Sequence, residues 1–357
     1  MNAPMQLSIP QVRVANLNLA TDARMVEAFV RAHPASTPFH LPAWSVATEK
    51  GCGQKAHYLM AESRGEVVGV LPLTETRSLL FGRALVSAGF AVGGGVLAYD
   101  DAVAALLIER AMALATSLKC PTLELKGGAR PASSSWHHDT ETYIGFTRPL
   151  AADDGAELLA IPRKQRAEVR KSLENGLTIE VGSGPRDRAA HYATYTASVR
   201  NLGTPVFPRT LFNAVLDGFG NDADILTIRH NGTPVASVLS LYHNGAVMPY
   251  WGGGTAAARG LRANELMYYA LMNHARARGC TDFDFGRSKV GTGAAAYKKN
   301  WGFEPQSLSY AKHSLDGSPP RSINPLDPKY ALQVRLWQKL PLPIANLMGP
   351  MIARGLG

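Results

Sequence analysis

Residues 251–288 read WGGGTAAARGLRANELMYYALMNHARARGCTDFDFGRS. The glycine triplet (252–254) marks a break in the chain. One face of the helical pattern that follows is mostly apolar, at Leu266, Tyr269, Ala270 and Asn273. The segment after Cys280 alternates aspartate and phenylalanine, which predicts a short strand with both aspartates on one face. The stretch therefore predicts a glycine-marked break, a helix and a strand.

The same order of elements occurs once more, earlier in the chain. Apolar runs that predict strands occupy 66–71 and 233–239, and glycine triplets follow at 93–95 and 252–254. The helical patterns then end near cysteines at nearly the same distance from each triplet. Chance similarity of two common strand–helix–strand units is the alternative, and we interpret the match as an internal duplication.

The composition limits the class of protein. A chain of 357 residues predicts about two domains, and its three cysteines lack the spacing of a disulfide framework or zinc site. We recognise neither a signal peptide nor an apolar stretch long enough to span a bilayer, so we expect a cytoplasmic protein. The formal net charge of +9 favours an anionic partner.

The segment between the repeats sets the expected domain division. The run 163–171 predicts a basic helix that Asn175-Gly176 ends. We expect an N-terminal domain over 1–155, a C-terminal domain over 156–315 and a tail over 316–357. The apolar, partly basic tail either packs on the body as a helix or lies on a membrane surface.

Three stretches carry a family resemblance: IPRKQRAEVRKSLENGLTIEV (161–181), residues 251–288 and AYKKNWGFEP (296–305). Together they resemble the FemAB-related, Fem-type aminoacyltransferases of the GNAT superfamily, and in particular those found with exosortase (PEP-CTERM) and exopolysaccharide systems. The resemblance implies an α/β (α+β) fold of two tandem GNAT-like domains, each a mixed β-sheet flanked by helices. It also implies transfer of an acyl or aminoacyl group to an amine or hydroxyl.

Such a transfer needs a nucleophile, a stabilised oxyanion and a cradle for the donor's phosphates. The sequence has no GxSxG motif and no cysteine–histidine pair at a family spacing, so we expect direct attack without a covalent enzyme intermediate. Arg262 stands where the GNAT phosphate loop has a glycine, which puts a close backbone approach to phosphate in doubt. The residues expected to bind the donor are Arg259, Arg262, Gly252, Gly253, Gly254 and Lys289.

The first half carries Asp100 and Asp101 at the corresponding place. Carboxylates at a helix start cap the helix and repel phosphate. We therefore expect the donor site of the first half to be degenerate and the active site to lie in the second half.

Lys298 matches the lysine of the Fem-type motif, and the resemblance implies that it neutralises an oxyanion or a donor phosphate. Asp284 is expected to orient Arg287 or Lys298, or to accept the proton of the attacking amine, with a structural ion pair as the alternative. The residues expected to contact the acceptor are Arg163, Arg166, Arg170, Tyr250, Trp251 and Tyr297. The alternatives are a solvated helix face for the arginines and a core position for the strand aromatics.

The function expected is therefore a Fem-type N-acyltransferase at the inner face of the membrane. Its acceptor would be an anionic small-molecule or lipid-linked component of the cell envelope or an exopolysaccharide. Acyl-CoA or aminoacyl-tRNA would be the donor, with no tightly bound cofactor and no metal, and the tail would contact the membrane. The alternatives are an acyl-CoA-dependent GNAT acetyltransferase and a non-catalytic component of exopolysaccharide or exosortase machinery.

Overall fold

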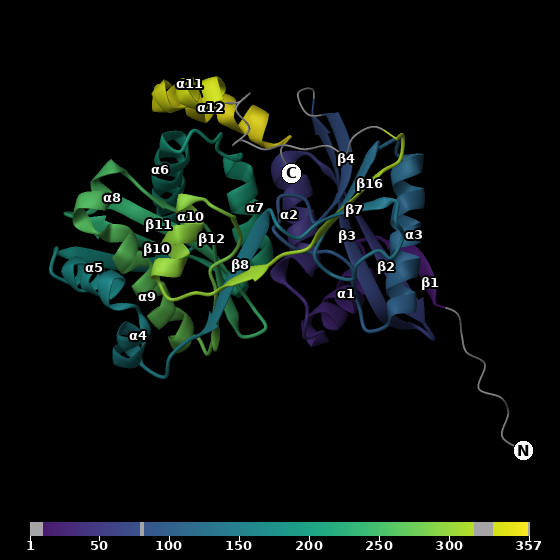
Figure 1. Ribbon diagram of the computed structural model, residues 1–357, viewed down its shortest axis with the longest axis horizontal. Helices are drawn as coiled ribbons and strands as arrows, with labels where there is room; N and C mark the ends of the chain where they lie inside the picture. Colours follow the sequence, from purple (N-terminus) through teal and green to yellow (C-terminus); the bar gives the residue numbers. More distant parts are fainter. Residues whose placement is uncertain (1–9, 79–81, 318–330, 356–357) are drawn as a thin grey trace, which may run out of the picture. The chain divides into compact units, whose positions relative to one another are not determined.

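The computed structural model describes residues 10–78, 82–317 and 331–355. These residues form two compact units, each with one mixed β-sheet and helices packed on it (Figure 1). Within the described residues, the first unit comprises positions 10–78, 82–139, 309–317 and 355, and the second comprises positions 140–308 and 331–354. The expected α/β architecture of two mixed sheets flanked by helices is confirmed.

The sheet of the first unit has the strand order β1-β2-β3-β4-β6-β16-β7, and β5 pairs with β3. The strands are β1 (Gln11–Ala15), β2 (Lys55–Ser63), β3 (Glu66–Ser78), β4 (Gly82–Ser87), β5 (Leu97–Ala98), β6 (Thr122–Lys126), β7 (Trp136–Asp139) and β16 (Tyr310–Ser314). The helices are α1 (Ala20–Ala32), η1 (Pro38–His40), α2 (Pro42–Cys52) and α3 (Asp101–Ser117). Apolar residues of α3, including Leu107 and Ala111, are buried with those of the sheet in one core.

The sheet of the second unit has the order β14-β8-β13-β12-β11-β10-β9, and β15 pairs with β8. The strands are β8 (Tyr143–Pro149), β9 (Leu177–Gly182), β10 (Ala223–His230), β11 (Thr233–His243), β12 (Ala246–Gly254), β13 (Asp282–Asp284), β14 (Ser288–Lys289) and β15 (Pro305–Ser307). The helices are α4 (Asp154–Ala160), α5 (Arg163–Leu173), α6 (Pro185–Asn201), α7 (Arg209–Phe219), η2 (Gly220–Asp222), α8 (Ala256–Leu261), α9 (Ala263–Ala277), α10 (Gly293–Asn300), α11 (Ala331–Lys339) and α12 (Leu342–Ala353).

The repeat predicted from the sequence is present in the order of the elements. The elements β3, β4, α3 and β6 correspond to β11, β12, α9 and β13. In both units the last of these strands runs parallel to the second strand of the set. The parallel pairing comprises Leu85–Leu123 and Val86–Glu124 in one unit, and Ala246–Asp282 and Val247–Phe283 in the other.

The two glycine triplets, in contrast, are not equivalent. Gly252–Gly254 are the last residues of β12, whereas Gly93–Gly95 lie outside the strands, before β5. In the first triplet Gly94 has a φ of +87°, and a Cβ on Gly95 would lie 1.9 Å from the Gly127 carbonyl oxygen. The first triplet therefore serves the packing of its own loop.

Two strands are exchanged between the sequence halves. Strand β8 follows β7 in the chain but pairs with β13, β14 and β15 of the second unit. Strand β16 follows β15 but pairs with β6 and β7 of the first unit. The compact units are consequently each built from more than one segment of the chain, and their boundary is not at residue 155. The division into domains 1–155 and 156–315 stays a prediction about the two repeated halves of the sequence. The described part of the tail forms α11 and α12, which lie beside α6 (Figure 1).

Aromatic side chains fill the core beside β13 in the second unit. Phe283, Trp301 and Phe303 are at most 1% exposed. Burial raises the pKa of the Cys120 and Cys280 thiols, the two cysteines that end the repeated helical patterns. Both thiols are therefore poor nucleophiles, as expected for small apolar residues.

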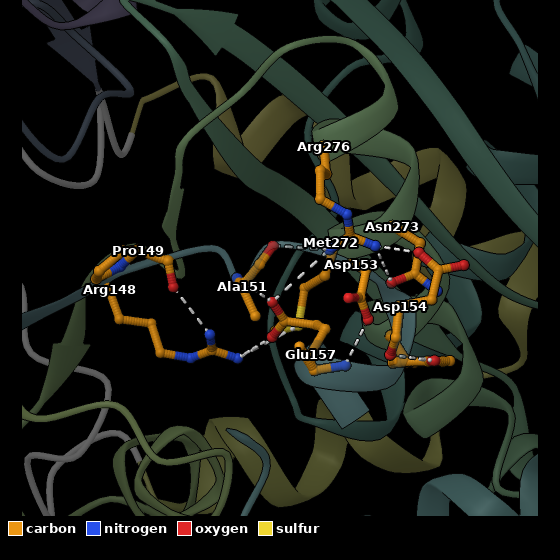
Figure 2. A network of polar contacts seen from close by, with 11 residues as sticks. Arg148, Pro149, Ala151, Asp153, Asp154, Glu157, Met272, Asn273 and Arg276 are labelled. Atoms are coloured by element: carbon orange, nitrogen blue, oxygen red, sulfur yellow. Dashed lines mark hydrogen bonds and ion pairs between the residues drawn. The ribbon is translucent and has the colours of Figure 1, made fainter. Parts of the chain in front are cut away.

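Glu157 anchors α4 to the rest of the second unit (Figure 2). Its buried carboxylate accepts hydrogen bonds from Arg148 of β8 and from the Ala151 N–H (2.8 Å), and lies 4.0 Å from Arg276 of α9. The Arg148 guanidinium also lies 4.7 Å from the centre of the Phe303 ring. Ion pairs of α4 therefore link β8 to α9.

Candidate active site

The candidate site begins where β12 leaves β13. Their parallel ladder ends at Val247 and Phe283, and β12 continues to Gly254 without β13 beside it. On its other side β12 stays paired with β11, with a β-bulge at Tyr250. The last residues of β12 therefore present backbone N–H and C=O groups toward an opening in the sheet.

Glycine at the end of β12 lets two helices approach the strand. A Cβ on Gly253 would lie 2.3 Å from the Ser198 Oγ of α6, and one on Gly254 would lie 2.7 Å from the Asn264 Oδ1 of α9. Both distances are shorter than a van der Waals contact, so a larger side chain would displace the helices. The close packing of α6 and α9 around β12 explains why this strand ends in glycine.

A cavity of about 600 Å³ opens at this point of the second unit. Its wall comprises Ser198, Asn201 and Leu202 at the end of α6, Gly253, Gly254 and Thr255 at the end of β12, Ala256 and Arg259 of α8, Asn264 and Tyr268 of α9, and Ala294 and Tyr297 of α10. Of the residues predicted to bind the donor, Gly253, Gly254 and Arg259 lie in this wall. Gly252 packs instead against Val238 of β11.

Two buried polar atoms of the wall, the Asn264 Oδ1 and the Tyr297 hydroxyl, have no hydrogen-bond partner among the described residues. Burial raises the pKa of Tyr297 well above its usual value, and Glu265 and Tyr268 raise it further. Burial also raises the pKa of Tyr268 to about 12. Because buried polar groups are normally paired, the two atoms are available to hydrogen-bond a water or a bound molecule.

Arg262 connects α8 to α9 in the left-handed conformation, with a φ of +56°. The arginine thus adopts the backbone conformation that glycine favours at such a position. Its guanidinium donates hydrogen bonds to Glu168 of α5 and to the Arg259 carbonyl oxygen (2.6 Å), and it holds the pKa of Glu168 below the usual range. The charge of Arg262 is therefore balanced by Glu168, and Arg259 is the cation in the cavity wall.

Lys298 of α10 points to the turn that follows β13. Its Nζ donates hydrogen bonds to the carbonyl oxygens of Gly286 and Arg287, both at 3.0 Å. Burial lowers the pKa of Lys298 to about 8, against the effect of Asp284. Asp284 accepts a hydrogen bond from the Gly286 N–H (2.8 Å), and burial raises the pKa of its carboxyl. Both side chains brace the Gly286–Arg287 turn, and neither is among the residues of the cavity wall.

Two further predicted cations lie over one ring. The Arg287 guanidinium is 4.5 Å and the Lys289 Nζ is 5.6 Å from the centre of Tyr143 on β8. The arginines predicted to contact the acceptor lie on the outer side of α5, whose opposite side buries Gln165 and Val169. They are exposed or half-buried at Arg163, Arg166 and Arg170.

The strand aromatics Tyr250 and Trp251 lie away from the cavity wall. Trp251 is 4% exposed, and its ring is 4.7 Å from that of Phe212 on α7. Tyr250 packs edge-on against Trp251 at 4.8 Å. The core position given as the alternative for Trp251 is therefore the one observed.

Sequence reasoning missed several residues of the wall. Ser198, Asn201 and Leu202 are brought to β12 by the fold alone, and no local motif marks them. Asn264 and Tyr268, in contrast, are one helical turn apart in a helix that the sequence predicted, and this spacing could have identified them as neighbours. Glu265, which is not part of the wall, was missed as well, and burial raises the pKa of its carboxyl.

The first unit differs at the corresponding helix start. Asp100 is the N-cap of α3 and accepts hydrogen bonds from the N–H groups of Ala102 (2.6 Å) and Val103 (3.4 Å). This confirms the predicted capping role. A carboxylate thus occupies the position at which a donor phosphate would need positive charge.

Residues 163–299 match the family model of the acetyltransferase (GNAT) domain. The second unit carries a GNAT-type acetyltransferase domain. This GNAT domain runs from α5 to the end of α10 and contains the opening beside β12, the cavity wall and the Lys298–Asp284 brace. A comparison with curated protein sequences gave no significant match.

Solved structures share the fold of the tandem arrangement. The crystal structure of FemX has a TM-score of 0.63 at 16% identity, over 82% of this chain and 96% of FemX. A tandem GNAT protein from the clavulanic acid biosynthesis pathway has a TM-score of 0.57 at 14% identity, over 87% of this chain and 100% of that protein. The C-terminal domain of a putative lysylphosphatidylglycerol synthetase from Agrobacterium fabrum has a TM-score of 0.57 at 13% identity, over 83% and 92%.

Two features are absent from the described ranges. In residues 10–78, 82–317 and 331–355, no helix is long and apolar enough to cross a membrane. Within the same ranges, no group of three or more histidine, cysteine, aspartate or glutamate side chains is placed to hold a metal ion.

Proposed function

We propose that the second unit is a Fem-type N-acyltransferase that transfers an acyl or aminoacyl group directly to an amine, or hydroxyl, of an anionic cell-envelope or exopolysaccharide-related acceptor. The observation that carries the proposal is the cavity at the end of β12 within the GNAT domain. Its wall combines unpartnered polar atoms of Asn264 and Tyr297 with the cation Arg259. A donor with a polar activated end and an anionic group would complement these features.

Direct transfer requires no enzyme nucleophile. Neither cysteine nor histidine is among the described residues of the cavity wall. The acceptor nitrogen attacks the donor carbonyl carbon, a C–N bond forms, and the C–S bond of a thioester or the C–O bond of an aminoacyl ester breaks. The attacking amine loses one proton to solvent or a nearby base.

The departing sulfur or oxygen must gain a proton as the bond breaks. Tyr297 is suited to this step because its raised pKa keeps the hydroxyl protonated. General acid catalysis of this kind contributes about 10²–10⁴-fold to a rate. Backbone N–H groups at the end of β12, beyond its pairing with β13, would hold the donor's polar chain.

Asp284, Arg287 and Lys298 retain a role in the proposal, but a revised one. Lys298 donates two hydrogen bonds to backbone carbonyl oxygens, and Asp284 accepts one from the Gly286 N–H. We assign both to positioning the turn that carries Arg287 and leads to Lys289. Arg287 and Lys289 then supply positive charge over the Tyr143 ring of β8.

The acceptor is assigned to the basic outer side of α5. Arg163, Arg166 and Arg170 expose cations on one helix of the same GNAT domain. The formal net charge of +9 for the chain favours the same class of partner. An anionic acceptor, such as a nucleotide-linked or lipid-linked sugar, fits this surface better than a neutral one.

Two donors are distinguished by their chemistry. Calorimetry with coenzyme A and filter binding with aminoacylated tRNA should show saturable binding of one of these two molecules. Intact-mass analysis after incubation with the corresponding acyl or aminoacyl donor should show an unmodified protein. A stable acyl adduct would contradict direct transfer. Binding of neither donor would contradict the acyltransferase proposal and favour the non-catalytic alternative.

A further inference from the structure

Helix α12 exposes a stripe of large apolar side chains. Ile344, Leu347, Met348 and Met351 are 45%, 75%, 44% and 67% exposed, and their spacing of i, i+3, i+4 and i+7 places them on one side of the helix. The opposite side carries the small buried residues Ala345, Gly349 and Ala353. A surface helix of a globular protein normally turns its large apolar residues inward, so the orientation of α12 is reversed.

Helix α11 also exposes large apolar side chains. Leu332 and Leu336, one turn apart, are 67% and 58% exposed. Figure 1 shows α11 and α12 (yellow) as neighbouring helices beside α6. The two helices therefore present six large apolar side chains to solvent, at 332, 336, 344, 347, 348 and 351.

The exposure does not result from an undocked tail. Gln338 accepts a hydrogen bond from Arg200 at its carbonyl oxygen (3.1 Å) and donates one from its side chain to the Asn201 carbonyl oxygen (3.2 Å). Val334 lies against Gly203, where a Cβ would be 2.5 Å from it, and Gly349 lies against Val206 in the same way at 3.0 Å. Specific contacts of the second unit thus fix which side of each helix faces outward.

The charged side chains within α11, α12 and the residues next to them have one sign. Residues 331–355 contain Arg335, Lys339 and Arg354 and no aspartate or glutamate. Apolar side chains flanked only by cations match an anionic lipid surface, where the apolar groups enter the headgroup region and the cations meet lipid phosphates. The described parts of α11 and α12 contain 9 and 12 residues, against about 20 needed to span a bilayer, so we place them in its surface.

We propose that α11 and α12 together form a membrane-surface site for anionic phospholipid. The same end of α6 that holds these helices, at Asn201, also lines the cavity through Ser198, Asn201 and Leu202. The membrane site does not depend on the proposed function. One consequence does rest on it, namely that the acceptor of the acyl group is a lipid-linked molecule presented at that surface.

Co-sedimentation with phospholipid vesicles tests the proposal in the full chain. We expect the protein to bind vesicles that contain phosphatidylglycerol and to bind pure phosphatidylcholine vesicles at least tenfold more weakly. The double variant Leu347→Ser/Met351→Ser should lose at least tenfold in partition. Leu159→Ser/Val290→Ser, which alters two side chains that are 64% and 55% exposed elsewhere in the unit, should bind as the wild type does.

A charge variant and a folding control complete the test. Arg335→Gln/Lys339→Gln should weaken binding to anionic vesicles by about tenfold or more, because each cation near the surface contributes on the order of 1 kcal/mol. All altered side chains are exposed or half-buried, and unchanged thermal unfolding would show that the variants fold. Absence of wild-type binding to anionic vesicles would overturn the proposal. Equal binding by the wild type and by Leu347→Ser/Met351→Ser would overturn it as well.

A dimer interface would expose the same apolar side chains in a single copy of the chain. If sedimentation shows a dimer that Leu347→Ser/Met351→Ser converts to a monomer, without vesicle binding, the surface joins two copies and the membrane proposal fails. Vesicle binding is measured without any acyl donor, and donor binding without vesicles. Loss of one with retention of the other therefore shows which of the two proposals has failed.

Discussion

At the scale of single residues, the site contains buried polar side chains without a hydrogen-bond partner and others whose hydrogen bonds are made within the protein. The Tyr297 hydroxyl and the Asn264 Oδ1 are buried without a hydrogen-bond partner among the described residues. Lys298 and Arg262, in contrast, donate hydrogen bonds to other groups of the protein. An unsatisfied buried group is costly, by about 1–3 kcal/mol. We therefore place the reacting part of the donor beside Tyr297 rather than beside Lys298.

Tyr297→Phe tests this placement, because it removes the hydroxyl and leaves the ring. We expect the turnover number to fall about 100-fold, as for loss of a general acid, while the dissociation constant of the donor stays within about threefold. Donor consumption in the presence of an acceptor amine measures the first quantity and calorimetry the second. Unchanged turnover would remove Tyr297 from the proton transfer.

Lys298→Met tests the buried amine through the pH dependence of stability. The folded-state pKa of Lys298 is about 8, below its ordinary value of 10.5, so the unfolded chain binds more protons between these pH values. The contribution of Lys298 to stability should therefore rise with pH from about 8 to about 10.5, by at most about 1.4 kcal/mol per pH unit. Urea unfolding of both proteins at pH 7 and pH 10 measures it. A stability difference that is the same at both pH values would contradict the lowered pKa.

At the scale of elements, ion pairs attach α4 to the rest of the second unit. Arg148 and Glu157 form a buried ion pair between β8 and α4 (Figure 2), and β8 pairs directly with β13 beneath the candidate site. Breaking such a pair leaves one charge buried without a partner. The network therefore links the stability of α4 to the geometry of the site.

Glu157→Ala should accordingly destabilise the protein by about 3–5 kcal/mol, because Arg148 stays buried without its carboxylate. The double variant Arg148→Met/Glu157→Leu should recover a large part of this loss, since it removes both charges. Urea denaturation of the two variants and the wild type supplies the free energies of unfolding. A loss below about 1 kcal/mol in Glu157→Ala would show that the pair contributes little.

The local sequence pattern was sufficient to predict the helices and strands, but not all of the contacts between them. The helix over 263–277 and the strand over 282–284 follow from the spacing of apolar residues, and Asp100 was recognisable as a helix cap. The different use of the two glycine triplets was not predictable, because it depends on Gly127 in one unit and on Ser198 and Asn264 in the other. Contacts between residues far apart in the chain decide such packing.

At the scale of the whole molecule, the exchange of β8 and β16 makes each unit depend on residues from the other sequence half. The duplication was visible in the sequence, since both copies keep their strand and helix patterns. The exchange was not, because β8 and β16 are short strands whose own residues do not indicate which sheet they join.

The exchange predicts how fragments of the chain behave. Residues 140–357 include β8, whereas residues 156–357 lack it and leave β13, β14 and β15 without their shared partner. We expect the longer fragment to unfold cooperatively at a higher temperature than the shorter one, as measured by circular dichroism. Equal melting of the two fragments would show that β8 is dispensable for the second unit.

The central claim is that the cavity beside β12 binds an anionic activated donor, and calorimetric titration of that donor into a charge-reversed variant tests it most directly. Arg259→Glu alters an exposed cation of the cavity wall, while Lys299→Glu makes the same change on exposed α10 outside that wall. We predict that Arg259→Glu weakens donor binding at least tenfold and that Lys299→Glu changes it less than threefold. Equal effects of the two substitutions would contradict the assignment of the donor to this cavity.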